Sequence, residues 1–208
     1  MNNVLSPDSL PFNWFDVLIV IVLFVGLQRG RKRGMSEELI SLLAWICIAV
    51  GCAIAYQPIG TFLADKSVFS LLSSYLMAYV AVAVVIGCVF AVFKRIAGGK
   101  LVGSDVFGKS EFYLGMVAGM VRFCCILITL LSLLNARMFN SQEVEAGKAY
   151  QNDVYGSNFF PTLYSVQAQV FEKSLAGPWI RNQLGFLLIK PTAPDDKQFK
   201  QKEYVSPI

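Results

Sequence analysis

The chain has 208 residues, of which 55% are hydrophobic and only 15% are charged, and it contains no histidine. Soluble domains have about a quarter of their residues charged, so this composition excludes an ordinary water-soluble globule and indicates a membrane protein. The absence of histidine excludes histidine-based catalytic triads and histidine metal clusters. The net charge is +4, and in a membrane protein the distribution of the charges matters more than their sum.

Four apolar segments are long enough to cross the hydrocarbon core as helices, which requires about 20 residues each. They lie at about 11–28, 39–60, 70–93 and 112–134. The second and third carry no charge, whereas the first contains Asp16 and the fourth contains Arg122. No lysine or arginine precedes the first segment, so we interpret it as a retained helix and not as a signal peptide. The predicted fold is an all-α polytopic membrane protein with four transmembrane helices.

The lysines and arginines of the short loops fall almost entirely on one side of the predicted membrane. One cation, Lys66, belongs to the loop between the second and third segments, and eight belong to the loops after the first and third. Because cytoplasmic loops carry the excess of positive charge, we expect both termini to lie outside, an N-out and C-out topology. The eight cations are Arg29, Arg31, Lys32, Arg33, Lys94, Arg95, Lys100 and Lys109.

The loop after the first segment combines a basic cluster with a helix start. Its four cations, Arg29, Arg31, Lys32 and Arg33, set the topology and can also contact anionic lipid headgroups. The sequence Ser36-Glu37-Glu38 follows, and it supplies a serine N-cap and favourable negative charge for the second helix.

The chain divides by composition into three parts. Residues 1–136 form the four-helix transmembrane domain. Residues 137–189 form an extracytoplasmic linker, polar to residue 158, followed by an amphipathic helix in which apolar side chains recur near helical spacing. Ser157 or Asn158 can cap that helix. Residues 190–208 are predicted to be disordered.

Asp16 and Arg122 form the candidate intramembrane polar pair. Charges inside a membrane are costly and usually face protein or water. The side chain of Arg122 is long enough to nearly close the axial gap between the two residues. The pair can therefore serve as a polar centre for the passage of an ion or solute, or as a structural ion pair that fixes helix register. Arg122 can alternatively be capped by carbonyl groups or paired across an oligomer interface, and Asp16 can sit at the wet end of its helix.

Small residues recur at four-residue spacing on three of the predicted spans, including Ala49 and Ala53 on the second. This spacing lets helix backbones approach closely in lipid, so it predicts a compact bundle or an oligomer. The helix-packing candidates are Gly115 and Gly119 on the fourth span, and Ala83, Gly87 and Ala91 on the third.

Other chemistry finds little support in the sequence. All five cysteines fall inside predicted spans, where they are packing residues and not a disulfide or metal site. The glycine-containing loop at 97–110 lacks the spacing of a phosphate-binding loop. We therefore expect no catalytic residue, no metal and no cofactor, and nothing indicates binding to nucleic acid. The expected partners are the lipid bilayer and either a second copy of the chain or another membrane protein.

The order of several short motifs resembles the bacterial colicin V production (CvpA) family. The first half carries that family's N/D-W-x-D-type signature, its Arg-Gly pair and its E-L-x-S-L-type second helix, and the fourth span carries a G-x-x-x-G-x-x-R stretch. A short S-x-x-x-P motif follows the last span. These motifs fall on Asn13-Trp14 and Asp16, Arg33-Gly34, Glu38-Leu39, Ser41-Leu42 and Trp45, Gly115, Gly119 and Arg122, and Ser157 and Pro161.

The resemblance implies a multi-pass protein of the bacterial inner membrane with an extracytoplasmic C-terminal tail. It further implies a role in toxin (colicin V) production or export or in envelope homeostasis, with no established reaction. Our leading hypothesis is a non-enzymatic membrane protein that acts through an oligomer or a partner. The alternative is a small channel or transporter component built around Asp16 and Arg122.

Overall fold

The structure, a computed structural model, describes residues 13–102, 108–157 and 161–193. The described chain is helical, and its one β feature is an isolated parallel bridge between Arg137 and Thr192. The long helices are α1 (Trp14–Lys66), α2 (Leu71–Val102) and α3 (Glu111–Asn135). The tail holds α4 (Ser141–Tyr155), α5 (Leu163–Phe171) and α6 (Ala176–Gln183), and 3₁₀ turns lie at Gly108–Ser110 and Gly185–Leu187.

Three of the described helices are long and apolar enough to cross a membrane: Trp14–Lys66, Leu71–Ile96 and Glu111–Asn135. The first has 53 residues. At 1.5 Å per residue it would span about 80 Å, more than twice the thickness of the hydrocarbon core. α1 therefore covers the first two predicted spans, and the basic segment between them is helical and not an open loop.

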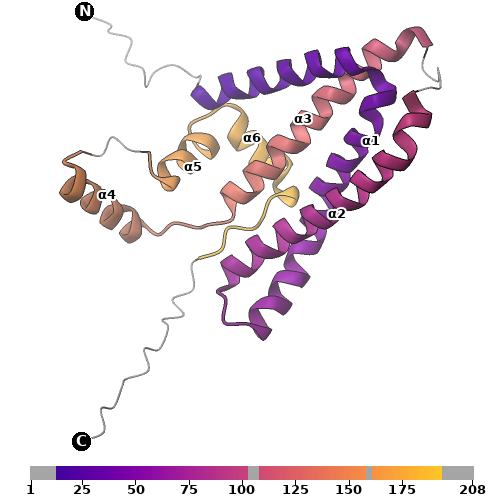
Figure 1. Cartoon of the computed structure of the whole chain (residues 1–208). Coiled ribbons are helices and arrows are strands. Elements are labelled where there is room, and N and C mark those ends of the chain that lie inside the picture. The colour runs from indigo at the N-terminus through magenta and orange to yellow at the C-terminus, as the bar shows by residue number, and fades with distance from the viewer. Residues whose placement is uncertain (1–12, 103–107, 158–160, 194–208) are drawn as a thin grey trace, which may run out of the picture.

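α1 bends at Gly34, the one residue inside it with non-helical torsion angles (φ 73°, ψ 169°). A positive φ is readily adopted by glycine and is strained for other residues. The bend divides α1 into an N-terminal arm, residues 14–33, and a C-terminal arm, residues 35–66. Figure 1 shows the ribbon turning sharply between the two arms, with α3 running beside the first and α2 beside the second.

The N-terminal arm packs on α3 through glycines on both helices. A Cβ atom added to Gly30 would lie 2.0 Å from the carbonyl oxygen of Gly115, and one added to Gly26 would lie 2.9 Å from that of Gly119. The two helices run antiparallel, so each four-residue step along one meets a four-residue step along the other. Gly115 and Gly119 thus lie where close backbone approach requires them, against partners on α1 that the sequence analysis did not identify.

The three small residues of α2 lie differently. Ala83 packs against the cluster around Tyr56 and Tyr79, but a Cβ on Gly87 would meet nothing within 4 Å and Ala91 is exposed. A helix has 3.6 residues per turn, so each four-residue step advances about 40° around it. One step from Ala83 leads to Gly87 and a second leads to Ala91, so both residues turn away from the line on which α2 meets α1.

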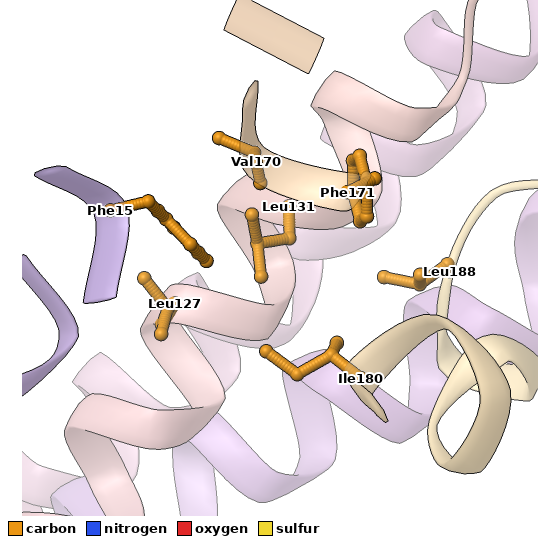
Figure 2. Close-up of a cluster of buried hydrophobic side chains, with 7 residues drawn as sticks. All are labelled: Phe15, Leu127, Leu131, Val170, Phe171, Ile180 and Leu188. Atoms are coloured by element: carbon orange, nitrogen blue, oxygen red, sulfur yellow. The ribbon is translucent and has the colours of Figure 1, made fainter. Parts of the chain in front are cut away.

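Two hydrophobic clusters hold the tail on the bundle. In the first, shown in Figure 2, Phe15 of α1 and two leucines of α3 meet four side chains of the tail. The second joins the C-terminal arm of α1 and helix α2 to Ile189, which is fully buried. The first cluster consists of Phe15, Leu127, Leu131, Val170, Phe171, Ile180 and Leu188.

The tail is more ordered than its composition predicts. α4 occupies most of the segment expected to be a linker, and none of its residues is buried. The amphipathic helix begins at Leu163 with Thr162 as its N-cap, in place of Ser157 or Asn158. In the segment predicted to be disordered, Lys190 forms a hydrogen bond with α1, and Thr192 forms hydrogen bonds with the backbone just after α3. Residues 194–208 lie outside the described residues.

We predict that Gly30→Ala destabilises the bundle, because its methyl group would collide with the backbone of α3. Overpacking of this kind costs about 1–3 kcal/mol. The free energy or midpoint of unfolding in detergent micelles measures the loss. Gly87→Ala is the matched control, since it makes the same substitution inside a helix with open space around it. Equal unfolding midpoints for the two variants would contradict the role of the glycine contact.

Candidate functional site

Asp16 closes the start of α1. The side-chain oxygen of Asn13 accepts a hydrogen bond from the backbone N–H of Trp14 at 2.7 Å, and the Asp16 carboxylate accepts one from the N–H of Asn13 at 3.0 Å. Asn13 and Asp16 thus form a capping box, which satisfies backbone donors that a helix start leaves open. Asp16 is only 8% exposed.

The same carboxylate also holds the start of α6, far away in the sequence. Its oxygens accept hydrogen bonds from the backbone N–H groups of Leu175 at 3.2 Å and Ala176 at 3.1 Å. A helix N-terminus carries unpaired N–H groups and partial positive charge, so a carboxylate is stabilising there. Asp16 therefore caps two helices at once.

Asn13 and Trp14 bind the neighbouring part of the tail. The amide of Asn13 donates to the backbone carbonyl of Gln169 at 2.8 Å, and the indole N–H of Trp14 donates to the side-chain oxygen of the same residue. We call Asn13, Trp14 and Asp16 the clasp. Through it, the residues of the N-W-x-D signature fasten α5 and α6 to the end of α1.

A second anchor fixes the chain after α6. Ser132 accepts a hydrogen bond from the N–H of Ile189 at 2.9 Å, and the amide of Asn135 donates to the carbonyl of Ile189 at the same distance. The hydroxyl of Tyr56 accepts from the N–H of Lys190 at 3.2 Å. Ser132 and Asn135 are both buried. Three polar side chains on the apolar helices thereby form hydrogen bonds with the backbone of the tail.

Arg122 forms a buried ion pair with Glu38. The guanidinium donates to the Glu38 carboxylate, whose second oxygen lies 3.5 Å from a guanidinium nitrogen of Arg33. Glu38 is fully buried and Arg122 is 6% exposed. The guanidinium carbon of Arg122 also lies 5.0 Å from the centre of the Phe123 ring, within the range of a cation–π contact. The pair joins the C-terminal arm of α1 to the middle of α3.

The structure does not bring Asp16 and Arg122 together. Asp16 lies in the first turn of α1, beside the tail, and its partners are backbone N–H groups. Arg122 lies nearer to the bend and pairs with Glu38. The expected polar pair is therefore replaced by two separate sites. Glu38, which the sequence analysis assigned to the charge of a helix start, is the residue that it missed.

The four cations after the first span have different surroundings. Arg33 faces Glu38. Arg31 and Lys32 line an open groove between α1 and α3, and Arg29 lines a smaller hollow together with Lys32 and Arg33. The basic cluster is thus divided between one buried contact and several exposed positions.

The polar contacts of both sites are structural in character. The bonds named above join side chains to backbone groups, to an opposite charge or, for Trp14, to the side chain of Gln169. Within the described residues, no group of three acidic or cysteine side chains could hold a metal ion. The five cysteines are free thiols on the membrane-length helices.

The comparisons with known proteins identify one family. A family model described as "Colicin V production protein" matches residues 15–168. No curated protein and no solved structure matches the chain. The matched segment contains Asp16, Glu38 and Arg122, together with all four glycines of the contact between α1 and α3.

We predict that Asp16→Ala releases the tail from the bundle. Hydrogen bonds to a charged group contribute about 1.5–3 kcal/mol each, so the opening free energy of α6 should fall by at least that amount. Hydrogen exchange at the amides of Leu175 and Ala176 measures it, and exchange should become faster. Asp65→Ala, at an exposed aspartate near the other end of α1, is the matched control. Unchanged exchange at these two amides would rule out the clasp.

We also predict that the ion pair behaves as a coupled unit. Removing one partner leaves a buried charge, which costs about 3–5 kcal/mol, so both Glu38→Gln and Arg122→Gln should strongly destabilise the protein. The double variant removes both charges and should lose less than the sum of the single losses. Unfolding measured as a double-mutant cycle gives the coupling energy. Additive losses would show that the two charges do not interact.

Proposed function

We propose that this chain, which belongs to the colicin V production protein family, is a non-enzymatic protein of the bacterial inner membrane. It supports toxin production or export, or envelope integrity, by presenting a folded extracytoplasmic tail to a second copy of itself or to a partner protein. One observation carries the proposal: the clasp holds α5 and α6 in a fixed position at the end of the bundle.

The tail offers a surface for such a contact. α4 has no buried residue and stands apart from the long helices (Figure 1). Its Tyr150 and Val154 are exposed. The clasp and the second anchor fix the tail on both sides of α6, so a contact made by α5 or α6 would be transmitted to the helices of the bundle.

The proposed topology has four crossings with both termini outside. The bend at Gly34 divides α1 into two arms, and each is long enough for one crossing. The basic residues near the bend and those near the end of α2 would share the cytoplasmic side, in agreement with the distribution of cations in the loops. The clasp would then lie on the opposite side with the tail.

The geometry favours this role over a channel or transporter built around Asp16 and Arg122. A path for ions needs polar groups that can exchange partners along the membrane normal. The Asp16 carboxylate is committed to two helix starts, and Arg122 is committed to Glu38.

The test places single cysteines in a chain whose five native cysteines are replaced by alanine or serine. Gly147→Cys lies on α4, where a side chain meets open space, and Ser110→Cys lies at the start of α3 on the predicted cytoplasmic side. In intact cells, a membrane-impermeant bifunctional thiol crosslinker should react only with the α4 cysteine and should yield a dimer or a partner adduct. The control cysteine should react only after the cells are made permeable.

Two results would overturn the proposal in separable ways. Reversed labelling of the two cysteines would refute the topology. Correct labelling without any adduct, together with a partner-free monomer by native mass measurement in mild detergent, would refute the association.

A further inference from the structure

A groove lined by both basic and apolar side chains runs between the N-terminal arm of α1 and the start of α3. Its volume is about 890 Å³. The α1 side follows helical spacing, with Phe24, Leu27, Gln28 and Arg31 on one face. Its described lining residues are Phe24, Leu27, Gln28, Arg31, Lys32, Phe112, Tyr113 and Met116.

The apolar part of the groove continues the surface that would face the acyl chains. Phe24 is 58% exposed and Phe112 is 60% exposed, while Leu27 and Met116 lie half-buried between them. Both helices are long and apolar enough to span a membrane. Exposed aromatic side chains at such a position are expected to lie against lipid and not against water.

The basic part of the groove has no internal counter-charge. Arg31 and Lys32 are both exposed, and neither forms an ion pair or hydrogen bond with another described residue. Among the described lining residues, none is acidic. The nearby carboxylates are directed elsewhere, because Glu38 is paired with Arg122 and Arg33 and the side chain of Glu111 lies against Gly34.

We propose that this groove is a binding site for an anionic phospholipid. The phosphate would lie between Arg31 and Lys32, with Gln28 and the hydroxyl of Tyr113 available as hydrogen-bond donors. An acyl chain would run between Phe24 and Leu27 on α1 and Phe112 and Met116 on α3, on the surface that would face the lipid. The combination of an uncompensated pair of cations with an adjoining apolar wall fits an amphiphile, and free phosphate would use only the basic part.

The site differs from general attraction of a basic loop to the membrane surface. Diffuse attraction depends on the number of cations near the surface and not on which ones they are. A groove site depends on Arg31 and Lys32 in particular, and on the wall beside them. At about 5.5-fold in affinity per cation, the two should together contribute about thirtyfold.

The test uses the full chain purified in mild detergent, with phosphatidylglycerol and phosphatidylcholine of identical acyl chains as probes. Native mass spectrometry measures bound lipid during titration. We expect the wild type to bind phosphatidylglycerol in preference to phosphatidylcholine. Arg31→Ala/Lys32→Ala should weaken phosphatidylglycerol binding about thirtyfold. The control Lys94→Ala/Arg95→Ala, which removes the same charge outside the groove, should leave it within about twofold.

A variant of the apolar wall completes the test. Phe112→Ser changes an exposed residue, so the fold should be retained, and binding of phosphatidylglycerol should weaken although the charge is unchanged. Inorganic phosphate at millimolar concentration should not displace the lipid. The proposal is overturned by equal losses in both double variants, by no preference for the anionic lipid, by unaltered binding to the Phe112 variant, or by displacement with inorganic phosphate. None of these outcomes depends on the topology or association of the chain.

Discussion

The close contact between the N-terminal arm of α1 and α3 sets the positions of the bend, the ion pair and the clasp. A Cβ atom on Gly30 would lie only 2.0 Å from a carbonyl oxygen of Gly115, so this approach of the two backbones requires glycine. An antiparallel pair locked at Gly30 and Gly115 has a determined register along its whole length. At one end of that register Glu111 meets the bend at Gly34, and at the other Phe15 meets Leu131 beneath the tail.

The bend at Gly34 brings Glu38 and Arg122 together as a buried ion pair. Past Gly34 the chain turns back along the bundle, so Glu38 enters the interior a few residues after an exposed basic segment. There it meets Arg122, seven residues along α3 from the glycine that contacts Gly30. Exchanging a buried pair for apolar residues often costs a protein nothing, so such a pair is better explained by specificity than by stability. Here it favours one angle between the arms of α1, because other angles would separate Glu38 from Arg122 and leave the buried guanidinium without its carboxylate.

The sequence was sufficient to predict the helices and to single out the unusual charges, but not to pair them. Apolar length predicts the membrane-length helices, and the cost of charge in such helices draws attention to Asp16 and Arg122. Estimating axial height alone suggested that they meet. Their partners depend on the bend, which carries Glu38 inward, and on backbone N–H groups of residues 175 and 176, which no side-chain pattern marks. α4 was not predicted because its composition is polar on average, which is typical of a linker, and it buries no face.

The clasp gives the N-W-x-D signature a structural role, which is to hold the tail at the start of α1. The position of these residues in an apolar helix does not indicate that role. An intramembrane aspartate invites interpretation as part of a conduction path, yet each of its hydrogen bonds here satisfies a helix terminus. A carboxylate that must stay charged to cap α6 would be a poor carrier of protons or ions, because each transfer would release the tail. The same dependence makes the aspartate well suited to a protein that must keep its tail in a fixed position relative to its long helices. The chemistry of Asp16 therefore favours presentation of a surface over transport.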